Sequence, residues 1–145
     1  MRLIRDLWQR VHEPRIISAI TSLTYLVLMS AGLYALVNPP SSIEGEIGTL
    51  AMRILAGTLA VGGAIGAPTA LTGIWWLERT AVLCIALSAA IYLMITLTLH
   101  VTSPSGNRLL QAAFIFAVLS MQAVRWHRIR ERPYDPTRPT PGTAD

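Results

Sequence analysis

Residues 16–37, IISAITSLTYLVLMSAGLYALV, form an apolar run without a single charge, and this run constrains the fold more than any other feature. A helix rises about 1.5 Å per residue, so a run of this length covers the roughly 30 Å hydrocarbon core of a bilayer. Backbone N–H and C=O groups in lipid must form their hydrogen bonds within the spanning structure, because no water is present there. A single run of residues achieves this only as an α-helix. The sequence therefore predicts a membrane-spanning helix here.

Three further apolar runs follow, at 47–76, 80–100 and 109–125. The last run is short, and we expect Arg108 and Arg125 to extend their side chains from its two ends to the interfaces. The chain is 52% hydrophobic and only 14% charged, whereas soluble domains carry about a quarter charged residues. Residues 15–132 are therefore predicted to form an all-α, integral membrane four-helix bundle.

The two ends of the chain differ from this bundle. Residues 1–14 place Trp8 and aliphatic side chains on one helical face and charged side chains on the other, which is typical of an amphipathic helix in the membrane interface. An ordinary surface helix packed on protein is the alternative. Residues 133–145, PYDPTRPTPGTAD, contain four prolines and no core-forming pattern, so we expect a disordered, flexible tail.

The connections between the runs carry local signals. Prolines 39 and 40 end the first helix, and Ser41 with Glu44 three positions later resembles a capping box that starts the second helix near Ser42. Residues 75–80, WWLERT, are predicted to be a short hairpin turn in which Glu78 offsets the charge of Arg79.

The arginines predict the topology. All 12 basic residues are arginines, and ten of them flank the same side of a four-span arrangement, against Arg53 and Arg108 on the other side. Cytoplasmic segments carry the excess of positive charge, so both termini should lie in the cytoplasm of a cell whose inner membrane holds the protein. Four tryptophans fall at the predicted cytoplasmic boundary, as an aromatic belt would: Trp8, Trp75, Trp76 and Trp126.

Small residues recur every three or four positions along the second run. We expect this stripe to pack helices closely, either within one bundle or between copies in an oligomer. Its members are Ala56, Ala60, Gly63, Ala67 and Ala70.

Candidates for chemistry are few. Arg53 is the one charge predicted inside a span, and an interfacial position or a pair with Glu44 or with Glu46, two turns back on the same helix face, explains it without a catalytic role. No acidic residue falls deep in a predicted span. The histidines, at 12, 100 and 127, belong to three separate helix ends, so they do not form one metal site. We assign no catalytic, cofactor-binding or metal-binding residue and do not expect an enzyme.

Three segments together, PPSSIEGEIG, GIWWLER and RWHRIRERPYDP, resemble the small four-helix membrane proteins encoded by actinobacterial bacteriophages. Some members of that group are assigned as holin-like. The resemblance implies a protein that oligomerises in the membrane and opens a lesion, with no catalytic residues.

Three functional hypotheses follow. The first is a holin or holin-accessory protein of the cytoplasmic membrane. The second is a membrane-anchored interaction or regulatory protein without pore activity, for example in superinfection exclusion. The third is a small transporter or membrane enzyme, for which the expected buried carboxylates, paired cysteines and clustered histidines are missing from the sequence. The expected partners are the lipid bilayer, anionic lipid at the basic terminal segments, further copies of the chain or an unidentified protein, but not nucleic acid.

Overall fold

The computed structural model describes residues 15–102 and 107–130, and these residues form five helices joined by short connections. Four of the helices are long and apolar enough to cross a membrane, as the apolar runs predicted, so the chain is a multi-pass membrane protein. The predicted amphipathic helix at 1–14 and the proline-rich tail at 133–145 lie outside the described residues. The helices are α2 (Arg15–Val37), α3 (Ser41–Ile47), α4 (Thr49–Thr72), α5 (Trp75–Thr102) and α6 (Leu109–Arg130).

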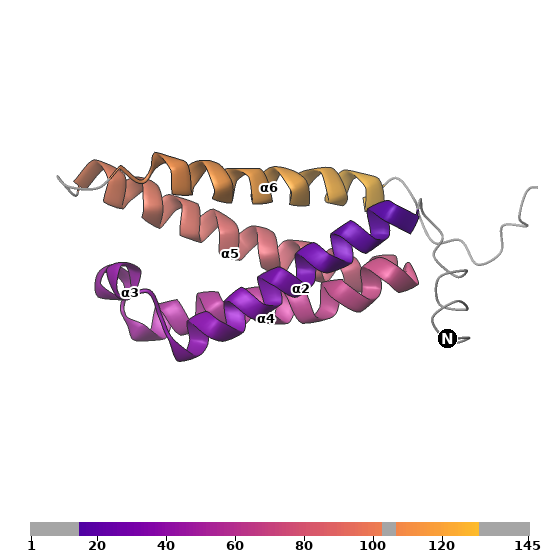
Figure 1. The fold of residues 1–145 in the computed structure, drawn as a ribbon, viewed down its shortest axis with the longest axis horizontal. Coiled ribbons are helices and arrows are strands. Elements are labelled where there is room, and N and C mark those ends of the chain that lie inside the picture. The colour runs from indigo at the N-terminus through magenta and orange to yellow at the C-terminus, as the bar shows by residue number, and fades with distance from the viewer. Residues whose placement is uncertain (1–14, 103–106, 131–145) are drawn as a thin grey trace, which may run out of the picture.

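The four long helices run along one another in alternating directions (Figure 1). One end of the bundle, named here the Trp75 end, holds the start of α2, the α4–α5 turn and the end of α6. The opposite end, named the α3 end, holds α3, the end of α5 and the start of α6. The helices pack in sequence order, α2 on α4, α4 on α5 and α5 on α6, whereas α2 and α6 do not form a packed pair. The bundle is therefore open between its first and last spans.

The connection between α2 and α4 differs from the prediction. The helix α3 begins at Ser41 directly after Pro40, and no side chain caps it, so the predicted capping box is wrong. The carbonyl of Pro40, a residue with φ of −62°, instead accepts hydrogen bonds from the N–H groups of Ile43 and Glu44 at 3.0 and 2.9 Å. Gly48 then adopts φ of +81°, which glycine tolerates best, and separates α3 from α4. Glu46 and Arg53 consequently lie on different helices, not on one face as predicted.

Glycines bring α2 and α4 into backbone contact. A Cβ atom on Gly63 would lie 2.6 Å from both the Tyr25 carbonyl oxygen and the Met29 nitrogen, and one on Gly32 would lie 2.7 Å from the Ala60 nitrogen. Such approach is open only to residues without a side chain, as in other close helix crossings in lipid. All members of the predicted stripe are buried in this arrangement: Ala56, Ala60, Gly63, Ala67 and Ala70.

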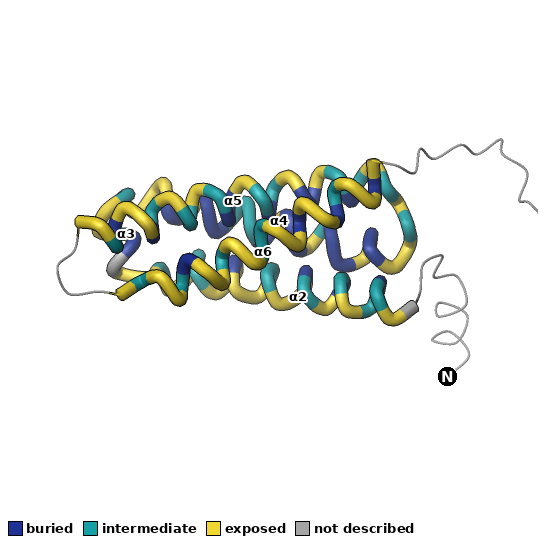
Figure 2. The backbone as a smooth tube through the Cα atoms, turned by 90° about the horizontal axis from the view of Figure 1, so that it is seen from above, coloured by how far each residue is buried: buried dark blue, intermediate teal, exposed yellow. Residues whose placement is uncertain are grey.

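Burial is concentrated on α4. Half of its most apolar segment is buried inside the protein, against 22% for α2 and 17% for α6. Figure 2 shows exposed positions along most of α2 and α6. The exposed side chains include Leu33, Phe114 and Phe116. A large apolar exterior of this kind is what a helix bundle presents to lipid.

Candidate functional site

The turn between α4 and α5 is not where the sequence predicted it. Gly73 adopts the left-handed conformation, with φ of +72°, and its N–H bonds the Thr69 carbonyl at 2.9 Å, which ends α4. The next helix begins at Trp75, so WWLERT is the first part of α5 and the prediction of a hairpin turn at 75–80 was wrong. Glu78 is consequently held on a helix, and its side chain is fully buried.

Glu78 forms a buried ion pair with Arg125 of α6. The Arg125 Nε atom lies 2.6 Å from Glu78 Oε1, and Nη2 lies 3.0 Å from Oε2, so the contact is bidentate. The two side chains are 0% and 7% exposed. The Arg125 guanidinium carbon also lies 5.9 Å from the centre of the Trp75 ring, within range of a cation–π contact.

This pair corrects three expectations. Arg125 does not extend to the interface to complete a short span. Glu78 neutralises Arg125, 47 positions away, rather than its neighbour Arg79. A carboxylate does lie buried among the helices, although the sequence assigned Glu78 to a turn. Because planar, bidentate pairing satisfies both charges, the buried pair links the start of α5 to the end of α6.

Arg79 makes a second link between the same helices. Its Nη2 atom donates to the backbone carbonyl of Ile129 at 3.3 Å, in the last turn of α6. Carbonyl groups in a last helical turn have no partner within the helix, so a cation is favourable there. Glu78 and Arg79 therefore both hold the Trp75 end of α6 against α5.

A cavity of about 340 Å³ lies beside this pair, between α2 and α6. The hydroxyl of Tyr25 is buried beside Arg125, with which it interacts. Oε1 of Gln122 is buried and has no hydrogen-bond partner among the described residues. Tyr25 is 1% exposed and Gln122 3% exposed. The lining residues are Ile17, Thr21, Thr24, Tyr25, Ser120, Met121, Gln122, Val124, Arg125 and Arg128.

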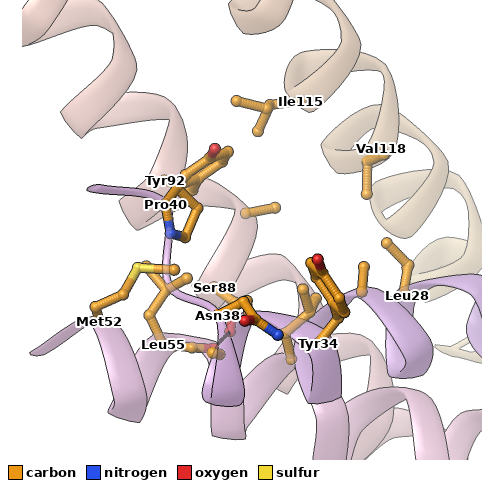
Figure 3. Close-up of a pocket in the computed structure, with 15 residues that line it drawn as sticks. Leu28, Tyr34, Asn38, Pro40, Met52, Leu55, Ser88, Tyr92, Ile115 and Val118 are labelled. Atoms are coloured by element: carbon orange, nitrogen blue, oxygen red, sulfur yellow. Dashed lines mark hydrogen bonds between the residues drawn. The ribbon is translucent and has the colours of Figure 1, made fainter. Parts of the chain in front are cut away.

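A second cavity, of about 410 Å³, lies closer to the α3 end and is mostly apolar. Figure 3 shows Ile115 and Val118 of α6 facing Leu28 and Tyr34 of α2 across it, with Met52 and Leu55 of α4 beside them. The remaining lining residues are Ala31, Ala35, Asn38, Pro40, Ala56, Leu59, Ser88, Ala89 and Tyr92.

Both cavities are lined by residues of α2 and α6, and the second is lined by residues of α4 and α5 as well. The lining positions on α2 are 17, 21, 24, 25, 28, 31, 34, 35 and 38. On α6 they include 115, 118, 122, 125 and 128. Residues that are three or four positions apart lie on the same face of a helix. The two cavities share no lining residue, and Leu28 and Val118 of the second pack against the cluster that contains Tyr25 of the first. They are therefore two separate openings along α2 and α6, both mainly apolar, and are named together the α2–α6 groove.

The predicted interface residues lie in different environments. Trp76 is 70% exposed, Arg53 is exposed near the start of α4, and Trp126 is half-buried. Trp75 is half-buried beside Arg125, and Trp8 lies outside the described residues. The aromatic-belt and topology predictions stay predictions, because no membrane is part of the structure.

The histidines stay apart in the described residues. His100 lies near the end of α5, and His127 near the end of α6, at opposite ends of the bundle. Within residues 15–102 and 107–130, no three histidine, cysteine or acidic side chains come close enough to hold a metal ion.

The sequence reasoning missed Tyr25, Glu78, Gln122 and Arg125 as members of one site. One signal was available: Gln122 is an amide inside an apolar run, and polar side chains in lipid-embedded helices face the protein interior. Comparisons with protein-family models, curated protein sequences and solved structures find no match to this chain. A function for this chain is therefore inferred from the geometry of the groove.

Proposed function

We propose that this chain is an interaction protein of the cytoplasmic membrane, with both termini in the cytoplasm, which binds another membrane component in the α2–α6 groove. One observation carries the proposal: α2 and α6 do not form a packed pair, and a cavity of about 340 Å³ lies between them, lined by Gln122, whose buried Oε1 atom has no hydrogen-bond partner among the described residues. A bundle selected for stability alone gains by closing this space, because buried polar groups without partners are destabilising.

The buried ion pair supports a binding role. Glu78 and Arg125 satisfy each other through two hydrogen bonds. The pair therefore holds α6, which forms one wall of the groove, in a fixed position against α5. A transporter that carries a proton on a carboxylate needs that carboxylate to lose and regain its partner. The short bidentate geometry favours a permanent structural link instead.

The second candidate function is a holin or holin-accessory protein that assembles into a lesion. The observation that favours it is the large apolar surface of α2 and α6, which a second copy of the chain would cover. The stripe of small residues gives it no support, because Gly63 and its neighbours already contact α2 of the same chain.

Expression in a bacterium separates the two functions. An interaction protein leaves membrane potential and culture density unchanged while it alters susceptibility to phage, whereas a lesion former causes an abrupt loss of both at a fixed time. The groove-filling substitution Val118→Trp should abolish the effect on phage susceptibility. Ala117→Trp is the matched control, because residue 117 is exposed and does not line the groove. Abrupt loss of potential, or equal effects of the two substitutions, overturns the proposal.

A further inference from the structure

We propose that the larger cavity of the α2–α6 groove, of about 410 Å³, binds one uncharged lipid whose polar end is a carbonyl-bearing ring, as in a prenylquinone. A ring carbonyl accepts a hydrogen bond from the Tyr92 hydroxyl, and the prenyl chain lies in the opening between α2 and α6. This inference rests on the proposed function and names the component that the groove receives.

The depth of Tyr92 in the membrane restricts the charge of the ligand. The helix α5 has 28 residues and is therefore about 42 Å long, and Tyr92 lies about 26 Å from its start. The hydrocarbon core is about 30 Å thick, so Tyr92 lies inside the core wherever the core falls along α5. None of the residues that line the cavity carries a charge, and charged groups are costly away from water. The polar end of a ligand beside Tyr92 is therefore uncharged.

The Tyr92 hydroxyl supplies a hydrogen-bond donor to this cavity. Its oxygen accepts a hydrogen bond from Gln111 Nε2 of α6 at 2.8 Å, and its own proton has no acceptor among the described residues. Figure 3 shows Tyr92 on the cavity wall, with its hydroxyl end directed toward α6 at Ile115. A tyrosine hydroxyl both donates and accepts, so a ligand that fits here presents an acceptor, such as a carbonyl oxygen.

An acceptor without a donor of its own distinguishes a quinone from other uncharged lipids. Diacylglycerol carries a hydroxyl, and a buried donor without a partner is destabilising. A quinone ring carries carbonyl oxygens and no donor. The cavity volume of about 410 Å³ is in the range of small-molecule sites, and the short side chains of four alanines leave room for a ring. These alanines are Ala31, Ala35, Ala56 and Ala89.

The opening between α2 and α6 gives the ligand a path from the lipid. These helices do not form a packed pair, and Figure 3 shows Leu28 of α2 and Val118 of α6 on opposite sides of the cavity. Hydrogen bonds of Gln111 and Arg125 hold α6 against α5 near both of its ends. The wall opposite α2 is therefore fixed, and the opening persists without a ligand.

Photocrosslinking of the full chain in proteoliposomes tests the proposal. The probe is a prenylquinone that carries a diazirine on its ring, and the crosslinked residues are identified by peptide mass spectrometry. We expect crosslinks around Tyr92 and Ile115, with competition by unlabelled prenylquinone but not by phosphatidylglycerol or diacylglycerol. Val118→Trp, which fills the cavity, should abolish these crosslinks, and the exposed control Ala117→Trp should keep them.

Two further substitutions separate a hydroxyl that binds the ligand from one that only serves the fold. Tyr92→Phe and Gln111→Leu break the same hydrogen bond within the protein, but only Tyr92→Phe removes the donor to the ligand. One hydrogen bond corresponds to about 2- to 10-fold in affinity, so Tyr92→Phe should raise the probe concentration for half-maximal crosslinking by that factor. Gln111→Leu should leave this concentration unchanged. Equal effects of the two substitutions overturn the role of Tyr92 in binding.

Other outcomes separate this inference from the proposed function. Diacylglycerol that competes as well as prenylquinone overturns the quinone assignment, and equal competition by phosphatidylglycerol means that bulk lipid fills the cavity. Dimers that exclude the probe and are disrupted by Val118→Trp make a second copy the occupant. Absence of crosslinks, while Val118→Trp still abolishes the effect on phage susceptibility, overturns the quinone alone. If Val118→Trp changes neither crosslinks nor susceptibility, both proposals are overturned.

Discussion

Replacing Glu78 by glutamine leaves Arg125 charged and buried without its carboxylate. The structure sets the size of the effect: two charge-assisted hydrogen bonds at 2.6 and 3.0 Å are weakened, and the arginine side chain is only 7% exposed. Breaking one side of a buried pair costs about 3–5 kcal/mol. We expect a loss of that size in the free energy of unfolding for Glu78→Gln and a similar loss for Arg125→Met.

The double variant Glu78→Leu with Arg125→Met behaves differently, because no buried charge remains. Apolar replacement of a buried pair is often neutral or stabilising, so its free energy of unfolding should be close to that of the wild type. Unfolding is followed in mixed micelles with an increasing fraction of dodecyl sulfate, by circular dichroism and by tryptophan fluorescence. The fluorescence includes Trp75, which lies beside Arg125 and reports locally on the pair.

Glu46→Gln is the control, because Glu46 is an exposed carboxylate on α3. Its effect should stay within about 0.5 kcal/mol, the usual range for surface substitutions. The reasoning fails if Glu78→Gln is as mild as this control. It also fails if the double variant loses as much stability as the two single variants together, since the two residues would then act independently.

Gly63→Ala should lower the free energy of unfolding by about 1–3 kcal/mol through overpacking against α2, whereas Gly57→Ala, whose Cβ would meet no atom closer than 3.9 Å, should be neutral or stabilising by up to about 1 kcal/mol. Equal effects in the same micelle assay would refute the close helix crossing. For the topology, single cysteines in a Cys84→Ser background are treated with an impermeant thiol reagent on intact cells. Ser41→Cys should be labelled and Ile74→Cys should not, and the reverse pattern would invert the predicted orientation.

The sequence predicted the four spans because hydrophobicity is a property of each segment alone. The run 16–37 agrees closely with α2, which covers Arg15–Val37, and the fourth run lies within α6. The boundary between the second and third spans was wrong. Glu78 and Arg79 are adjacent in WWLERT, so the sequence suggests that they neutralise each other. The turn lies upstream because Gly73 adopts the left-handed conformation, and this is only one of several backbone conformations that glycine permits.

The sequence by itself determined that this chain is a helical, multi-pass membrane protein, since uncharged runs of such length satisfy their backbone in lipid only as helices. Tertiary structure alone decided what the polar residues do. The partner of Glu78 is 47 positions away on another helix, and Tyr25 and Gln122 line one cavity only because α2 and α6 flank the same opening. Contacts between distant segments depend on the order and crossing of helices, which hydrophobic periodicity does not specify.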